Sequence, residues 1–506
     1  MKLAGFLVAS PVLGLLGVIA CGGQAPAPAA PPAGAAPPLP PSASAAPSAD
    51  VLGPRPEPPM APPFLPPSPT TFQGPNGMTV WLLERHEAPV VSCDVTVPTG
   101  ASSDPAGKGG VAYVTANMLD EGAGKRGAID LSKAIDDLGA RIDTEANADA
   151  SFVSLAVLKR NLGDALAIYA DVIARPRLEA AEFKRVKELW HNELLQRAKE
   201  PDATARVVYR VALFGPDHPY GHPWDGTPKS AAAVGLEDVK RFYKAAWRPD
   251  RATLVCAGDT TRAELEPLLQ TTFGSWKAPA TPAPPPIAPP APAGPWPPVV
   301  VVDRPEAPQV VVAFVRPGVA ASSPDIAPLW RVNTAIGGSF TSRLNTDLRE
   351  EHGYTYGAGS RFSVSRGPGL VLSSADVVTD KTGEAVDAMM GDLRKFADGG
   401  LTDAEVDKTR SEARADLVSA YEMVERISGH LASDASLGLP ADYEATLAKA
   451  RDAAPKADLD AVAKRLYSPD GAMLVMVGPK AKLQAVIETL HLPPPSIRDE
   501  EGKPVP

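Results

Sequence analysis

The segment Trp247-Arg-Pro-Asp-Arg-Ala-Thr-Leu-Val-Cys-Ala-Gly258 decides the fold, because its pattern returns about 220 residues later as Tyr467-Ser-Pro-Asp-Gly-Ala-Met-Leu-Val-Met-Val-Gly478. In both copies a Pro-Asp pair is followed by an apolar run, which predicts a turn that leads into a buried strand. A repeat of this length is too long for a solenoid. We therefore predict a duplication, with two homologous α+β domains that face each other.

The segments around the two copies follow the same order. A strand-like run lies at 78–83 in the first half and at 309–314 in the second, and glycine pairs follow at Gly109-Gly110 and Gly337-Gly338. We predict that each pair begins a helix. Apolar residues at helical spacing then predict a helix over 161–174. A second helix is predicted over 179–198.

Proline marks the boundaries of these halves. Residues 22–70 hold 18 of the 57 prolines and residues 277–298 hold another 11, and both segments are rich in alanine. Such segments bury too little apolar surface to fold. We predict a disordered tether before the first domain (71–276), a linker (277–298), a second domain (299–495) and a tail (496–506).

The N-terminus carries export signals. Lys2 precedes an apolar run that ends at Ala20, which predicts a signal peptide over 1–20. The sequence from Val18 to Gly22 resembles a bacterial lipobox, which implies cleavage before Cys21 and lipidation of its thiol. Residues 21–70 would then tether the protein to a membrane. Gly22 replaces the aspartate associated with inner-membrane retention, so we expect the outer membrane, facing the periplasm. A plain signal peptide remains the alternative.

Charge and cysteine content limit the partners and the redox state. The net charge is -10, and no Lys/Arg cluster suggests a nucleic-acid surface. Cys93 and Cys256 each lie in a strand-like apolar run. A periplasmic location would permit a disulfide between them. Two buried thiols remain the alternative, because the sequence does not give their distance.

The stretch Gly110-Val-Ala-Tyr-Val-Thr-Ala-Asn-Met-Leu-Asp-Glu-Gly122 carries the most informative functional signal. It resembles the zinc-binding helix of insulinase-type peptidases, which reads Gly-x-Ala-His-x-x-Glu-His-Met. In that helix two histidines bind zinc and the glutamate acts on water. The histidine positions hold Tyr113 and Asn117 here, and the glutamate position holds Ala116. Glu193 lies where the resemblance places the third zinc ligand.

The resemblance to the insulinase/pitrilysin family extends over nearly all of both halves, and it is greatest to bacterial two-domain members and mitochondrial processing peptidase subunits. Further matching segments are Asp137–Asp143, His218–Pro223, Phe242–Asp250, Gly337–Leu344 and Leu348–Tyr356. The implied fold is α+β, with two homologous domains that each have a mostly antiparallel sheet and helices on one face. Family members enclose extended or unfolded peptides between such domains.

The zinc chemistry is missing from this sequence. A site of this type needs two imidazoles four residues apart on one helix face and an acidic third ligand. Asn117 offers a neutral amide, and Tyr113 must first lose a proton with a pKa of ~10. Ala116 cannot act as a base, and losing a general base usually costs ~10²–10⁴ in rate. We expect no cofactor in this chain, and Glu193 is better explained as a solvated or paired helix residue.

The remaining histidines do not restore a metal site. His218 and His222 are four residues apart, but Pro219, Gly221 and Pro223 predict a loop, so the helical pairing geometry is absent. The other five histidines are scattered singly and indicate surface or packing positions. We therefore do not expect an active metallopeptidase from this chain alone.

The second half keeps a different part of the chemistry. In peptidases of this family the C-terminal domain supplies an arginine and a tyrosine seven residues apart, which bind substrate near the scissile bond and stabilise the oxyanion. Arg349 and Tyr356 match this pair. The sequence predicts a helix over 342–352 that ends at Gly353. A strand follows, on which Tyr354 and Tyr356 share a face.

Two alternatives to this assignment stay open. Arg349 could pair with Glu350 or Glu351 as surface charge, and Tyr356 could pack within the sheet. Arg343 and Tyr354 are the nearest competing residues for the two roles.

The resemblance implies a divided enzyme. Some bacterial members place the zinc motif in one chain and the Arg/Tyr pair in another, and the heterodimer is the peptidase. We predict that this chain is the second kind, that its partner is a zinc-bearing homologue with a His-x-x-Glu-His motif, and that zinc lies in that partner. A non-catalytic binding or assembly protein on the same fold is the alternative. A self-sufficient zinc peptidase is the least favoured.

Overall fold

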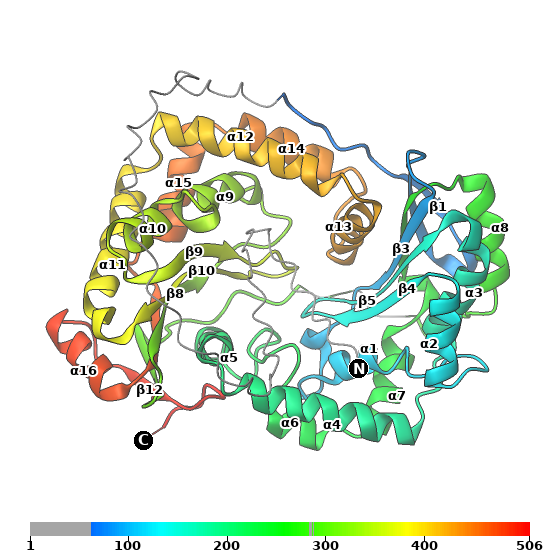
Figure 1. Cartoon of the computed structure of the whole chain (residues 1–506), viewed down its shortest axis with the longest axis horizontal. Helices are drawn as coiled ribbons and strands as arrows, with labels where there is room; N and C mark the ends of the chain where they lie inside the picture. Colours follow the sequence, from blue (N-terminus) through cyan, green and yellow to red (C-terminus); the bar gives the residue numbers. More distant parts are fainter. Residues whose placement is uncertain (1–61, 283–285, 287, 506) are drawn as a thin grey trace, which may run out of the picture. The chain divides into compact units, whose positions relative to one another are not determined.

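The computed structural model describes residues 62–282, 286 and 288–505, which Figure 1 traces. The expected signal peptide, the lipidation site Cys21 and most of the tether lie outside the described residues. The described residues all belong to one compact unit. Within the part of the chain that is described, every helix is too short or too polar to cross a membrane.

A six-stranded sheet forms the centre of the first half, in the spatial order β1-β2-β6-β3-β5-β4. Its strands are β1 (Thr70–Gln73), β2 (Thr79–Glu84), β3 (Val90–Val97), β4 (Arg141–Ala146), β5 (Ser151–Leu158) and β6 (Thr253–Gly258). The helices are α1 (Val111–Asn117), α2 (Ala128–Asp137), α3 (Leu162–Ala174), α4 (Ala180–Arg197), α5 (Pro201–Phe214), α6 (Pro228–Ala233), α7 (Leu236–Ala246) and α8 (Arg262–Phe273).

The second half has its own six-stranded sheet, in the order β12-β7-β11-β8-β10-β9. Its strands are β7 (Val299–Asp303), β8 (Gln309–Pro317), β9 (Thr355–Phe362), β10 (Leu370–Val378), β11 (Met473–Gly478) and β12 (Ser496–Arg498). The helices are α9 (Ile326–Asn333), α10 (Arg343–Asn345), α11 (Thr382–Gly399), α12 (Asp403–Ala420), α13 (Val424–Ser436), α14 (Tyr443–Ala453), α15 (Lys456–Tyr467) and α16 (Lys480–Thr489).

The two sheets have equivalent topologies. Strands β2, β6, β3, β5 and β4 occupy the same places as β7, β11, β8, β10 and β9. In each series the first pair is parallel and the other three pairs are antiparallel. The repeated Pro-Asp segments end in β6 and β11, which are equivalent strands. The predicted fold of two homologous halves with mostly antiparallel sheets is therefore confirmed.

One face of the first sheet packs against helices of its own half. Helix α3 buries Leu166, Tyr169 and Ile173 in this core, as the helical spacing predicts. The Tyr169 hydroxyl donates to the backbone oxygen of Val153 and accepts from the backbone nitrogen of Val95 at 2.7 Å. This buried phenol thus ties α3 to two central strands, and its polar group is satisfied there.

The other face of each sheet is covered by a helix from the opposite half. Helix α13 packs against β3 and β6 of the first sheet, where Ile427 and Leu431 join Trp81 and Val255 in one apolar cluster. Helix α5 packs against β8 and β11 of the second sheet, where Val208 is buried. Figure 1 labels α13 near β3 and α5 near β8. Because α5 and α13 are each the third helix after the equivalent strands β5 and β10, the exchange is reciprocal.

The exchange adds a layer that the sequence prediction lacked. Helices cover one face of each sheet, as expected, and the second face is buried by the exchanged helix rather than left to solvent. The valine-rich runs in β7, β8 and β11 are consistent with burial on both faces.

The local predictions have mixed outcomes. Helices α3 and α4 confirm the helices predicted over 161–174 and 179–198. The prediction for Gly337-Gly338 is wrong, because these residues end the π-helical turn Thr334–Gly338 after α9. A Cβ on Gly337 would lie 2.3 Å from the backbone nitrogen of Ser360. The glycine is therefore needed for close approach to β9, and it does not begin a helix.

Cys93 and Cys256 are opposed residues on the antiparallel strands β3 and β6. Their Cα atoms are 4.1 Å apart and their sulfurs form a disulfide. The sequence leaves open a disulfide or two buried thiols, and the structure contains the disulfide. The bond joins neighbouring strands at the centre of the first sheet.

Replacing both cysteines, Cys93→Ala with Cys256→Ala, should lower the free energy of unfolding by about 2–5 kcal/mol, since the bond restricts a long loop in the unfolded chain. Urea unfolding of the oxidised protein measures the change. A reductant should lower the free energy of unfolding of the wild type by a similar amount and should not change that of the double variant. A wild type that is equally stable with and without reductant would contradict the disulfide.

The exchanged helix makes a second prediction about stability. Ile427 on α13 is 0% exposed, and Ile427→Ala should lower the free energy of unfolding by about 2–5 kcal/mol. Because α13 also packs against the sheet of the first half, probes in both halves should report a single unfolding transition. Its midpoint should lie at a lower denaturant concentration than in the wild type. Val418→Ala, at a position 43% exposed, is the control and should change stability by at most ~0.5 kcal/mol. A shift confined to the second half would argue against the exchange.

Candidate functional site

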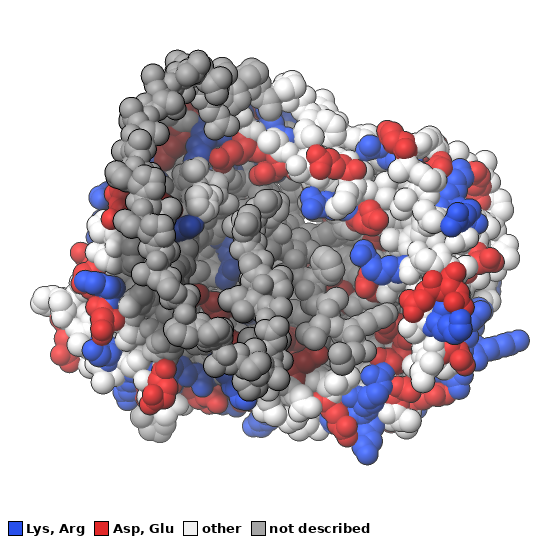
Figure 2. All heavy atoms as spheres, viewed as in Figure 1, with Lys and Arg blue, Asp and Glu red and all other residues white. Residues whose placement is uncertain are grey.

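Among the described residues that Figure 2 shows, surface charge does not single out a site. Lys and Arg are interspersed with Asp and Glu over these residues. The candidate site is therefore built from the helix α1, the neighbouring helix α4 and the segment that contains Arg349 and Tyr356.

Helix α1 begins at a tight junction. Gly110, its N-cap, has a φ of +94°, and a Cβ there would lie 2.4 Å from Cζ2 of Trp190 and 2.9 Å from the backbone oxygen of Asp225. Asp104 accepts hydrogen bonds from the backbone nitrogens of Gly110 (2.6 Å) and Ala112 (2.9 Å). Burial raises the pKa of Asp104 to about 7, although these donors favour the carboxylate. The first turn of α1 is thus fixed against α4.

The structure brings the degenerate zinc positions together. The Tyr113 hydroxyl donates to Oε2 of Glu193 at 3.2 Å, and the side chain of Asn117 lies close enough to hydrogen bond with this phenol. Ala116 is buried in the core of the first half. Tyr113 and Asn117 on α1 thus lie beside Glu193 on α4, and the assignment of these positions to a degenerate zinc site stays a prediction.

These residues do not fit a zinc ion. Burial, together with the negative charge of Glu193, raises the pKa of Tyr113 to about 12. The phenol therefore remains protonated at neutral pH and acts as a donor to Glu193. A phenol, an amide and a methyl group do not provide the imidazole and thiolate ligands that hold structural or catalytic zinc. A hydrogen bond now links α1 to α4 at this point.

Aromatic side chains surround the altered site. The ring centroid of Tyr113 lies 6.1 Å from that of Trp190 and 5.5 Å from that of Trp224. Nε1 of Trp190 donates to the backbone oxygen of Asp225 at 2.8 Å, and Arg197 pairs with the Asp225 carboxylate. Edge-to-face rings and these polar contacts hold α4 and the loop before α6 against α1.

The two histidines of the predicted loop have separate partners. Nδ1 of His218 accepts from the backbone nitrogen of Tyr220 at 3.0 Å, and Nε2 lies 3.1 Å from the backbone oxygen of Pro290. Nε2 therefore carries the proton. Nδ1 of His222 contacts the backbone oxygen of Pro223 at 3.1 Å, and burial lowers the pKa of His222. The arrangement is a loop, as predicted, and the two rings do not converge on a metal.

This loop instead connects the two halves, which the sequence analysis missed. The Tyr220 hydroxyl donates to Oδ1 of Asp149 at 2.7 Å and accepts from the backbone nitrogen of Gly367 at 3.0 Å. The backbone nitrogen of Arg366 donates to the other carboxylate oxygen of Asp149 at 2.8 Å. The bonded residues are far apart in the sequence, so no local pattern could have indicated these contacts.

Arg349 lies on the π-helical turn Thr346–Glu351 that follows α10. The helix predicted over 342–352 is thus present but not regular, and Gly353 ends it with a φ of +64°. The Arg349 guanidinium lies 4.7 Å above the ring of Phe340, and its Nε is 3.4 Å from the Glu350 carboxylate. The side chain is 37% exposed. Such a solvent-exposed ion pair is weak, so the guanidinium remains available to a ligand.

Tyr356 lies on a β-bulge near the start of β9. Thr355 pairs with Val377 and Ala358 with Ala375, so Tyr356 and Gly357 together lie opposite one residue of β10. The Thr355 hydroxyl satisfies the irregular backbone by accepting from the nitrogen of Gly357 at 3.1 Å. The Tyr356 side chain is 88% exposed, and its hydroxyl has no hydrogen-bond partner among the described residues. Bulges often redirect a side chain near a functional site.

The competing residues have structural partners. Nε and Nη2 of Arg343 donate to the two oxygens of Glu405 at 2.7 and 2.6 Å, and its guanidinium lies 4.8 Å from the Phe396 ring. The Tyr354 ring stacks on His352 with centroids 4.9 Å apart. The expectation that Tyr354 and Tyr356 share a strand face is wrong, because β9 begins at Thr355. The bulge breaks the alternation that this expectation assumed.

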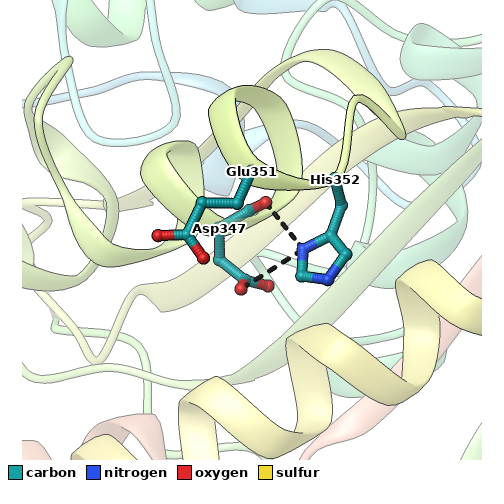
Figure 3. Close-up of side chains that lie close together, drawn as sticks. All are labelled: Asp347, Glu351 and His352. Atoms are coloured by element: carbon teal, nitrogen blue, oxygen red, sulfur yellow. Dashed lines mark hydrogen bonds and ion pairs between the residues drawn. The ribbon is translucent and has the colours of Figure 1, made fainter.

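A group of potential metal ligands lies beside Arg349. Asp347, Glu351 and His352 place one ligand atom each within 4.8 Å of one another (Figure 3). Nδ1 of His352 lies 3.0 Å from the backbone oxygen of Asp347 and 3.4 Å from its carboxylate. Burial raises the pKa of Asp392, which faces Asp347, to about 6. Contacts within the group account for its geometry, and nothing besides proximity indicates an ion.

Comparison with known proteins agrees with this geometry. The family model for insulinase (peptidase family M16) matches residues 79–212, and the model for the peptidase M16 inactive domain matches residues 233–412. An uncharacterized zinc protease of Mycobacterium tuberculosis is 25% identical over 77% of this chain and 88% of its own length. A non-peptidase homolog of Helicobacter pylori is 20% identical over 72% of this chain and 83% of its own length.

A solved structure has the same fold. The peptidase M16 inactive domain from Pseudomonas fluorescens superposes with a TM-score of 0.75 and 24% identity, covering 81% of this chain and 98% of that one. The fold and the family models thus define a peptidase-type scaffold that includes an inactive-type domain. The chain belongs to the insulinase family, peptidase family M16.

Restoring the family residues tests how far the framework is preserved. The triple variant Tyr113→His, Ala116→Glu, Asn117→His should retain about one zinc ion per chain after dialysis, because α1 already faces Glu193 on α4. Wild-type protein should retain none. Metal analysis measures the content, and adding Glu193→Ala to the triple variant should reduce it. A folded triple variant without zinc would show that the helices no longer have the required geometry.

Proposed function

We propose that this chain is the subunit without zinc in a two-chain insulinase-type peptidase. In this proposal a homologue with a His-x-x-Glu-His motif holds the zinc, and this chain supplies Arg349 and Tyr356 to the bound peptide. The observation that carries the proposal is the contrast between the two halves. The first half has replaced its metal ligands with a hydrogen-bonded pair, whereas the second half presents an exposed arginine and tyrosine.

The altered helix supports a role without metal. The neutral phenol of Tyr113 and the carboxylate of Glu193 satisfy each other, so the site is packed and hydrogen bonded without an ion. The framework is thus kept while the zinc chemistry is absent, as a subunit that must still assemble would require.

The Arg/Tyr pair supports a role in binding substrate. An arginine offers several fixed donors to a carbonyl or carboxylate, and a tyrosine hydroxyl can donate to an oxyanion. A single oxyanion donor is worth ~2.7–4 kcal/mol in other enzymes. Tyr356, on the bulge, is 88% exposed to solvent. The weak ion pair with Glu350 leaves the guanidinium of Arg349 free to bind another partner.

The names of the relatives fit both kinds of subunit. The Mycobacterium tuberculosis relative is named a zinc protease, and the Helicobacter pylori relative is named a non-peptidase homolog. We extend the proposal to location: lipidation at Cys21 would hold the complex at the outer membrane, facing the periplasm, where it would act on extended or unfolded peptides.

A second candidate is a non-catalytic binding or assembly protein on the same fold. The non-peptidase homolog of Helicobacter pylori favours it, since that name describes a relative without peptidase function. The two candidates differ in whether a zinc-bearing homologue is bound. Purification of the tagged chain from its native membrane, followed by identification of associated proteins, separates them.

The peptidase proposal is tested by mixing this chain with the zinc-bearing homologue and measuring peptide cleavage. Tyr356→Phe removes only the hydroxyl and should lower kcat by about 10²–10³ if the tyrosine stabilises an oxyanion. Arg349→Ala should lower kcat/KM sharply. Neither change should affect assembly, which analytical ultracentrifugation measures.

Two matched variants serve as controls. Tyr354→Phe alters the neighbouring tyrosine, and Arg394→Ala alters an exposed arginine on α11 that pairs with Asp470. Both should leave cleavage unchanged. Full activity in Arg349→Ala and Tyr356→Phe would remove the proposed role of the pair, and failure of the two chains to associate would favour the assembly protein.

A further inference from the structure

A pocket of about 250 Å³ lies between α12, α14 and the segment Pro63–Leu65. Its lining combines apolar side chains with four cations, Arg410, Arg414, Lys449 and Arg451, and one carboxylate, Asp452. This pocket lies on elements other than those that carry Tyr113, Arg349 and Tyr356, and the proposed function does not use it.

Arg451 lines the pocket with an incompletely satisfied charge. The residue is only 8% exposed, its guanidinium lies 5.5 Å from the ring of Trp330, and its Nε is buried without a hydrogen-bond partner among the described residues. Burial lowers the pKa of Arg451, while the charges of Glu444 and Asp416 oppose this. No carboxylate of the described residues forms an ion pair with Arg451. A buried donor without a partner is costly and calls for an explanation, such as a bound ion.

A second buried arginine adds positive charge behind the pocket. Arg331 is fully buried and donates to the backbone oxygens of Val406, Arg451 and Ala454. It thereby fixes the end of α14 that carries Arg451. Burial, together with repulsion by Arg410, lowers the pKa of Arg331 to about 10. Cations that repel one another at one place are stabilised by an anion between them.

Two carboxylates near the pocket, Asp452 and Asp407, already pair with other arginines. Asp452 accepts from Nε of Arg414 at 2.6 Å, and Asp407 accepts from Nη1 of Arg410 at 3.2 Å. Nε of Arg410 is nevertheless buried without a hydrogen-bond partner in the described part of the chain. Lys449 forms no ion pair with any described residue. Donors from both helices are therefore left over at a pocket large enough for a small ligand.

We propose that this pocket binds a phosphate group. A phosphate offers several oxygens and up to two negative charges, and it suits arginine donors that approach from different directions. Arg410, Lys449 and Arg451 would supply the donors. Phe64, Leu65 and Leu417 would contact the carbon portion attached to the phosphate. The phosphate could belong to a soluble ester or to a lipid headgroup, and both present the same chemistry to the pocket.

Isothermal titration of the full chain tests this proposal, with inorganic phosphate as the first probe at constant ionic strength. Dihexanoyl phosphatidic acid is the second probe, and dihexanoyl glycerol, which lacks phosphate, is its control. We expect saturable binding of a phosphate-bearing probe and none of dihexanoyl glycerol. Tighter binding of the lipid than of inorganic phosphate would assign the site to a lipid phosphate, and equal or weaker binding would assign it to a soluble one.

The variants change Lys449, which is exposed, and Arg410, which is partly exposed, because removing the buried Arg451 could unfold the chain. Lys449→Ala and Arg410→Gln should each weaken binding about tenfold, the effect of losing one charged hydrogen bond. Lys395→Ala is the control: this lysine on α11 has a 79% exposed side chain and does not line the pocket. Failure of both phosphate probes to bind the wild type, or equal binding by wild type, Lys449→Ala and Arg410→Gln, would overturn the proposal.

Discussion

Burial of both faces of two sheets is the constraint on which the rest of the structure depends. Each half provides helices for one face of its own sheet, and the second face is apolar as well. The reciprocal placement of α5 and α13 covers the second face of both sheets. It also explains why the described residues all belong to a single compact unit although the topology is a duplication. The Tyr220 contacts then join the halves through hydrogen bonds at a second place.

Within this frame the two halves have diverged in chemistry more than in architecture. Helix α1 retains the glycine junction and the approach to α4 that a metal site would need, yet a protonated phenol and a carboxylate occupy the site. In the second half a π-helical turn and a β-bulge, both departures from regular geometry, carry Arg349 and Tyr356. Such departures weaken local structure, and they are usually found where a side chain must point in a direction that a regular helix or strand does not allow.

The sequence predicts the parts of this structure that depend on local pattern. The repeated Pro-Asp segments identify equivalent strands, and helical spacing locates α3 and α4. Tyr113 and Glu193, which the family resemblance assigns to one degenerate zinc site, are hydrogen bonded to each other. The exchange of α5 and α13 could not be predicted, because the apolar pattern of a helix indicates that one face is buried but not which sheet it packs against. The bulge at Tyr356 also escapes periodicity, since one extra residue reverses the alternation on which a strand prediction rests. The Cys93–Cys256 bond required the register of β3 and β6.

The exchanged helices also change the role of the linker between the halves. Once folding is complete, buried contacts from α5 and α13 hold the halves to each other, so the covalent connection is not what keeps them associated. Its contribution comes earlier, when it keeps the unfolded halves at a high effective concentration and so favours their pairing within one chain. The folded halves should therefore stay associated even when the polypeptide chain between them is cut. A nick in the linker would leave one particle made of two fragments, with the equivalent halves still interlocked.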